Sequence, residues 1–154
     1  MSDDTSLDNE YTQAREHCGY FWMEDWQLGE TTGKDTFSFL QTQTTNDCLV
    51  LKPGEGHVNA IVTRKANLLG TFTLYKTTGE HAFLLMEKHQ ADKVIASLEE
   101  FHFREDIAFK KKLDSLNLLA LQGPKSRLLL AEISGQVQTE FTTCEIRQLR
   151  IDNE

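Results

Sequence analysis

The 154-residue sequence lacks any apolar stretch near the length needed to cross a bilayer, which is about 20 residues. Its first ten residues, MSDDTSLDNE, are acidic and polar, so they lack the basic and apolar regions of a signal peptide. Cys18, Cys48 and Cys144 are far apart and form no CxxC pair. These absences predict a soluble cytoplasmic protein with no membrane partner, whose thiols are reduced and mostly buried.

Positive charge is also scarce. Sixteen Lys and Arg residues face 24 Asp and Glu residues, which gives a formal net charge of −8. Proteins bind nucleic acids by neutralising phosphates with Lys and Arg, so we expect no direct nucleic-acid partner. The 39% of hydrophobic and 26% of charged residues are typical of a globular chain, and the length fits about one domain with a single core.

Signatures of catalytic sites are missing as well. His57 follows a glycine-rich loop, but the chain has no nucleophile elbow. His81, His89 and His102 do not have the spacing of metal ligands on a helix. The lysine run 110–112 is most simply a solvated strand edge, although it could also meet an anionic ligand tail. The residues alone therefore predict no catalytic residue and no metal site.

At the N-terminus we expect an acidic, flexible leader over residues 1–12, followed by one domain over residues 13–154. The aromatic-rich stretch 20–26 then either anchors this part of the chain to the core or stacks on a ligand. After a turn at residues 31–35, Phe37, Phe39 and Leu40 have the spacing of an apolar helix face. This helix should end near residues 44–47, which are β-branched or Asx residues.

The middle of the chain predicts strands. Strands are expected at 58–63, 69–76 and 82–86, with a hairpin turn at 78–80. Within the second strand, Phe72, Leu74 and Lys76 share one face, and Thr71, Thr73 and Tyr75 share the other. Further elements follow in this order: a helix at 89–101, an edge strand at 107–111, a buried strand at 116–121, a helix from about Pro124 to Ile133, and one or two weak strands within 137–151.

This order of elements predicts an α+β fold with a mostly antiparallel sheet and packed helices. No GxGxxG motif follows a strand, which argues against a Rossmann fold. Composition and pattern alone do not identify a ligand.

A resemblance to a known family adds to this prediction. Residues 32–47, TGKDTFSFLQTQTTND, resemble the opening motif of YgfZ-type folate-binding proteins, which are relatives of the glycine-cleavage T-protein, an aminomethyltransferase. The likeness continues through LKPG at 51–54, VTRKANLL at 62–69 and the helix near 91–101, and it ends at LQGPK, 121–125. The chain thus resembles the N-terminal part of this superfamily.

The resemblance implies a tetrahydrofolate-binding scaffold, in which an antiparallel sheet forms one wall of the pocket. Tyr75 matches a family tyrosine near the folate, and Val58 stands where the T-protein has another tyrosine. With Thr71, Asn59 and Arg64, these residues make up the predicted cofactor-binding set. Thr71 and Tyr75 share a strand face, so both could look into one cavity; the same face could equally be core or solvent.

The departures from the family matter too. The T-protein carries adjacent aspartates at the positions of Gly70 and Thr71, and neither residue here can carry their charge. This predicts a folate-binding module of the YgfZ type without aminomethyltransferase chemistry. That branch implies a role in iron–sulfur protein maturation or repair, or in tRNA modification, with iron–sulfur proteins as partners.

Some family features are absent from the sequence. The reactive-cysteine motif of the YgfZ branch, KGCYxGQE, does not occur, and neither do the second half of the folate-binding region and the C-terminal barrel. A homodimer or a missing C-terminal half would then complete the pocket. Two alternatives stay open: an interaction or scaffold domain that has lost folate, and an active aminomethyltransferase.

Overall fold

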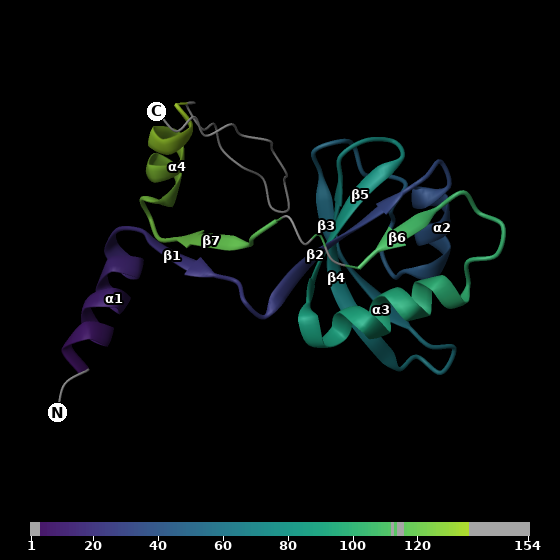
Figure 1. The fold of residues 1–154 in the computed structure, drawn as a ribbon, viewed down its shortest axis with the longest axis horizontal. Helices are drawn as coiled ribbons and strands as arrows, with labels where there is room; N and C mark the ends of the chain where they lie inside the picture. The colour runs from purple at the N-terminus through teal and green to yellow at the C-terminus, as the bar shows by residue number, and fades with distance from the viewer. Residues whose placement is uncertain (1–3, 112, 114–115, 136–154) are drawn as a thin grey trace. The chain divides into compact units, whose positions relative to one another are not determined.

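The computed structural model describes residues 4–111, 113 and 116–135. These residues fall into two compact units. One unit holds the described residues up to Met23 and those from Leu118 onward, and the other holds those within Glu24–Asn117. Figure 1 shows the elements of each unit along the chain.

A five-stranded antiparallel sheet forms the larger unit. Its strands lie in the order β3-β4-β5-β2-β6. Chain neighbours β3, β4 and β5 form a meander, and β2 inserts between β5 and β6. The bounds are Trp26–Thr32 for β2, Gly56–Val62 for β3, Leu68–Lys76 for β4, His81–Glu87 for β5 and Ala108–Lys110 for β6.

One face of this sheet is closed by two helices, α2 (Thr36–Gln43) and α3 (Lys88–Glu100). Their buried side chains join those of the strands in one apolar cluster. The residues at its centre are at most 2% exposed: Leu40, Phe72, Leu74, Ala82, Leu84, Met86, Ala91, Val94 and Leu98. We call this side the closed face. Burial of these side chains provides most of the unit's hydrophobic stabilisation.

A glycine turn places α2. Gly33 has a φ of 129°, and a Cβ at this position would lie 2.0 Å from the carbonyl oxygen of Asp106. Only glycine fits such a contact. The carboxylate of Asp35 accepts a hydrogen bond from the Asp106 amide at 2.8 Å. The Gly-Lys-Asp part of the opening motif therefore joins the start of α2 to the segment before β6.

The smaller unit consists of α1 (Asp4–Glu16), the strands β1 (Gly19–Trp22) and β7 (Leu119–Gln122), and α4 (Ser126–Ser134). The two strands pair antiparallel from Gly19 with Gln122 to Trp22 with Leu119. The turn after β7 contacts the end of α1, since the Lys125 amide donates to the His17 carbonyl at 2.8 Å.

The structure confirms the α+β prediction and most of its elements. The predicted helices near 36–44, 89–101 and 124–133 correspond to α2, α3 and α4. The hairpin strands correspond to β3, β4 and β5, and the segment expected at the sheet edge is β6, which lies at one edge of the sheet. The predicted strands within 137–151 lie outside the described residues.

Three expectations differ from the structure. A helix, α1, spans Asp4–Glu16, where a flexible leader was expected over residues 1–12. The expected division between this leader and a domain starting at residue 13 falls inside the helix, and this division stays a prediction. Tyr20, Phe21 and Trp22 do not anchor a core, because they are 67%, 45% and 60% exposed. The strand near 116–121 is β7, and it is not buried: Leu119 is 45% exposed in a two-stranded sheet.

Candidate functional site

The sheet of the larger unit has a second face, opposite the closed one. Side chains alternate between the two faces along each strand. On β4 the residues Gly70, Phe72 and Leu74 are buried on the closed face, whereas Thr71 and Tyr75 are half-buried on the other. We call this second side the open face.

Strand register shows which open-face residues are neighbours, because directly paired residues project to the same side. One row crosses the sheet through Val58, Thr73, Leu85 and Leu28. The next row passes through Gly56, Tyr75, Phe83, Glu30 and Lys110. Except for Val58 and Lys110, which are exposed, these residues are half-buried. The open face is thus a mixed surface of aliphatic, aromatic and hydroxyl groups.

Three of the predicted cofactor-binding residues come together on this face. Thr71 and Tyr75 lie on β4, and Val58 lies on β3 opposite Thr73, between them in register. Val58 is 58% exposed. Arg64 is exposed in the turn between β3 and β4, and Asn59 lies on the closed face with 1% exposure. The predicted set is therefore split over two faces and a turn.

Asn59 ties a loop to the sheet. Its Oδ1 accepts a hydrogen bond from the Asn46 amide at 3.0 Å, and its side-chain nitrogen is 2.9 Å from His57 Nδ1. His57 Nε2 is 3.0 Å from the carbonyl oxygen of Asp47. Because Nε2 meets an acceptor, it carries the proton, and Nδ1 accepts from Asn59. These bonds give Asn59 a structural task in holding the Thr-Asn-Asp part of the opening motif.

The same loop buries a thiol. Cys48 is fully buried, and its amide donates to Gln41 Oε1 at 2.7 Å. Burial raises the pKa of the Cys48 thiol above its ordinary value, and hydrogen bonds from Thr44 and Asn59 oppose this only in part. Cys48 is therefore a protonated, inaccessible thiol, which does not suit a nucleophile.

Gly70 and Thr71 have different surroundings although they are adjacent. A Cβ at Gly70 would lie 2.6 Å from Cγ2 of Val94 on α3. The absence of a side chain thus lets α3 approach the sheet. Thr71 projects to the open face, and its amide donates to Gln90 Oε1 at 2.9 Å. The resemblance implies acids at both of these positions. Only a side chain at position 71 lies on the same face of the sheet as Tyr75, because position 70 faces α3.

Several open-face residues were missed from the sequence. Glu30 lies between His81, at 3.4 Å from its Nε2, and Lys110, at 4.0 Å from its Nζ. His81 also contacts the ring of Phe83 edge-on, with centroids 4.8 Å apart. Phe83 and Leu85 belong to the continuous apolar run 82–86, which assigns neither residue to a face. The insertion of β2 beside β5 depends on pairing that no local pattern encodes.

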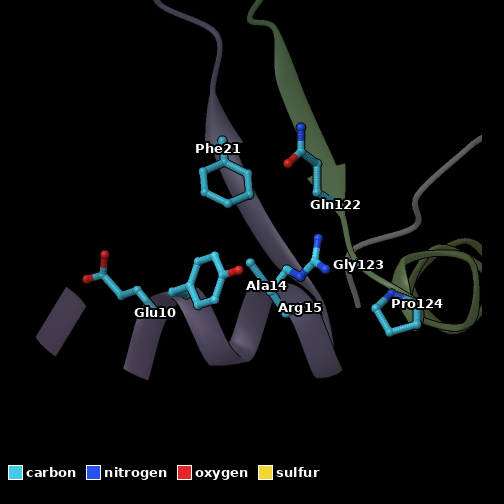
Figure 2. Close-up of a pocket in the computed structure, with 8 residues that line it drawn as sticks. Glu10, Ala14, Arg15, Phe21, Gln122, Gly123 and Pro124 are labelled. Carbon is cyan, nitrogen blue, oxygen red and sulfur yellow. The ribbon is translucent and has the colours of Figure 1, made fainter. Parts of the chain in front are cut away.

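A groove of about 540 Å³ lies in the smaller unit (Figure 2). It is formed by α1, β1 and the turn after β7, and is lined by Glu10, Tyr11, Ala14, Arg15, Phe21, Gln122, Gly123 and Pro124. Its volume is within the range of ligand pockets. None of the predicted cofactor-binding residues lines it, and its aromatic wall is exposed, with Tyr11 at 66%.

Two features are absent from the described residues. No three His, Cys, Asp or Glu side chains among them are placed to hold a metal ion. None of the helices in this part of the chain has the length and apolar character of a membrane span.

Comparison with known proteins decides the family. Residues 2–153 match the model of the GCVT N-terminal domain. The chain belongs to this family. It is 29% identical over 146 residues to an aminomethyltransferase of Bacillus velezensis, and 27% identical over 125 residues to one of Chloroherpeton thalassium. These matches cover 95% and 81% of the chain. The resemblance drawn from the motifs is thereby confirmed at the level of the superfamily.

A solved structure confirms the fold. The glycine cleavage system aminomethyltransferase T from Bartonella henselae superposes with a TM-score of 0.75 and 24% identity, over 89% of this chain and 37% of that one. The chain spans 37% of the B. velezensis relative and 34% of the C. thalassium relative. It therefore corresponds to about a third of these proteins, and their activity is not carried over with the fold.

Proposed function

We propose that the open face forms part of the wall of a tetrahydrofolate site. The observation that carries this proposal is the set of half-buried groups on that face, with Tyr75 and Phe83 paired in register and Thr73 and Leu85 in the next row. Rings and aliphatic groups beside a few hydroxyls suit a flat heterocycle, which needs apolar walls and oriented polar atoms. Membership of the GCVT N-terminal domain family supports folate as that heterocycle.

Calorimetric titration of the chain with tetrahydrofolate under anaerobic conditions tests the proposal. Binding in the micromolar range is expected, and Tyr75→Ala should weaken it about ten-fold because it removes one aromatic wall. Tyr20→Ala is the matched control, since Tyr20 is an exposed tyrosine of the smaller unit. Absence of binding by the wild-type chain, or equal losses in the two variants, would refute the proposal.

For the biological role we propose a YgfZ-like module that supports iron–sulfur protein maturation or tRNA modification in the cytoplasm, without aminomethyl transfer. Support comes from the opening motif, residues 32–47, and from Gly70 and Thr71 at the positions of the T-protein acids. A homodimer or a C-terminal half would complete the pocket. A cell that lacks the protein should then lose activity of iron–sulfur enzymes, and unchanged activity would count against this role.

Aminomethyl transfer is the second candidate, because both relatives described above are named aminomethyltransferases. A turnover assay with an aminomethylated carrier protein separates the two candidates. Transfer by the wild-type chain would replace the first role by the second, while leaving the folate site on the open face intact.

A further inference from the structure

The outer edge of β3 is covered by a short segment of its own chain. β3 is the first strand in the order of the five-stranded sheet, so its backbone groups that point away from β4 lie at an edge. Such an edge is a template on which another chain can add a strand. The covering segment follows α2 and comprises residues 44–47, the Thr-Thr-Asn-Asp end of the opening motif. We call this segment the strap.

Thr45 of the strap makes the two hydrogen bonds that a paired strand residue would make. Its amide donates to the carbonyl oxygen of Ala60 at 3.1 Å, and its Oγ1 accepts from the Ala60 amide at 3.1 Å. In an antiparallel ladder, a hydrogen-bonded partner exchanges the same two bonds through its own amide and carbonyl oxygen. The Thr45 hydroxyl therefore takes the place of a backbone carbonyl group, and both outward groups of Ala60 are satisfied.

Asn46 fixes the strap to β3 at two further points. Its Nδ2 donates to the carbonyl oxygen of Val58 at 3.2 Å, which is another outward group of the edge. Its amide donates to Oδ1 of Asn59 at 3.0 Å, on the closed face. The next residue, Asp47, has its carbonyl oxygen 3.0 Å from Nε2 of His57. The strap thus holds both the edge of β3 and side chains that β3 presents.

The covered edge is complementary to a second copy of itself. In a symmetric antiparallel pair centred on Ala60, Ala60 of one copy meets Ala60 of the other, and Val58 meets Val62. Val58 and Val62 lie on the open face with Ala60 between them, and they are 58% and 46% exposed. Pairing would place these valines side by side across the two strands and bury part of both. The central bonds would use the same two Ala60 groups that Thr45 occupies.

We propose that the strap blocks β3 against strand addition by a second copy of this chain, and that the Thr45 hydroxyl is the group on which the block depends. An uncovered strand edge beside exposed valines would favour association. A homodimer that completes the folate pocket must then use another surface. This inference concerns the edge of the sheet and does not depend on whether the open face binds folate.

Sedimentation velocity over a wide range of concentration tests the inference on four proteins: the wild type, Thr45→Val, Thr45→Ser and Thr32→Val. Thr45→Val removes the acceptor of the Ala60 amide with little change of shape. A dimer displaces two straps, so a hydrogen bond worth about ten-fold counts twice, and dimerisation should tighten by up to about 100-fold. Thr45→Ser keeps the hydroxyl and should behave as the wild type. Thr32→Val is the matched control, an exposed threonine of β2 within the same sheet.

A second substitution identifies the surface. Val62→Lys, added to Thr45→Val, places a charge opposite Val58 of the other copy and should restore the wild-type state of association. If Thr45→Val associates no more strongly than the wild type, the inference is wrong. It is equally wrong if Val62→Lys leaves the association of Thr45→Val unchanged, or if the wild type itself dimerises and Val62→Lys abolishes that dimer.

Hydrogen exchange of the wild type needs no variant. The Ala60 amide lies on the outer side of an edge strand, yet it should exchange slowly because Thr45 Oγ1 accepts its hydrogen bond. An Ala60 amide that exchanges as fast as an unprotected one would overturn the inference even if Thr45→Val failed to fold.

Discussion

The closed and open faces of the same sheet differ in how completely their side chains are buried. Leu74 and Leu84 are fully buried on the closed face, whereas their chain neighbours Tyr75 and Leu85 are half-buried on the open face. Both faces are built by the same strands and carry large side chains. The difference teaches that the helices α2 and α3 bury the side chains of one face, whereas the side chains of the other face stay half-buried among the described residues.

The largest effect on stability is expected from the same substitution at Gly70 and Thr71, which are adjacent in the chain but lie on opposite faces of the sheet. Gly70→Asp places a carboxyl group against Val94 on the closed face, and Thr71→Asp places one on the open face. We expect Gly70→Asp to lower the free energy of unfolding by about 4 kcal/mol or more, through overpacking and a buried charge. Thr71→Asp should change it by less than about 1 kcal/mol. Urea denaturation measures both, and equal losses would contradict the assignment of faces.

A second pair compares the same substitution on the two faces. Leu84→Ala leaves a cavity in the closed face and should cost about 3 kcal/mol. Leu85→Ala removes a half-buried side chain and should cost about 1 kcal/mol. The free energies of unfolding from denaturant titration check this order. A reversed order would mean that the open face is the main core.

The third prediction concerns Asn59, which the resemblance had placed among the folate ligands. Asn59→Ala leaves the Asn46 amide without its acceptor and should cost about 2 kcal/mol. Asn67→Ala, at an exposed turn position, should cost less than about 0.5 kcal/mol. The affinity of folded Asn59→Ala for tetrahydrofolate decides between the two roles. A large loss of affinity at unchanged stability would make Asn59 a ligand after all.

The smallest effect is a dependence of stability on pH. The pKa of Cys48 is raised by burial in the folded state, so the folded chain holds this proton more tightly than the unfolded chain. Stability from this group is complete below the ordinary thiol pKa of 9.0 and is lost as pH rises through the folded value. Cys48→Ala should therefore flatten the fall in unfolding free energy above pH 9.0, and an unchanged slope in urea denaturation at several pH values would contradict this.

Much of the closed face could be predicted from the sequence. Phe72 and Leu74 alternate with less apolar residues, and Val94, Ile95 and Leu98 have helical spacing, so local periodicity was sufficient for these residues. The opening motif also indicated the family, although its glycine packs against Asp106, which lies far along the chain. The periodic features depend on near neighbours in the chain.

The rest depended on long-range pairing. β2 contains Gly29, Glu30 and three threonine or glutamine residues, which is a weak strand signal, yet it lies inside the sheet. Asn59 could not be assigned to a face until the β3 register was known.

The most direct test is methyl NMR during titration with tetrahydrofolate. Val58, Leu28 and Leu85 report on the open face, and Leu74, Leu84 and Leu98 report on the closed face. If the open face binds folate, resonances of the first group should shift with a common dissociation constant while those of the second group stay nearly fixed. Shifts confined to the closed face, or to methyl groups of the smaller unit such as Leu119 and Leu121, would contradict binding at the open face.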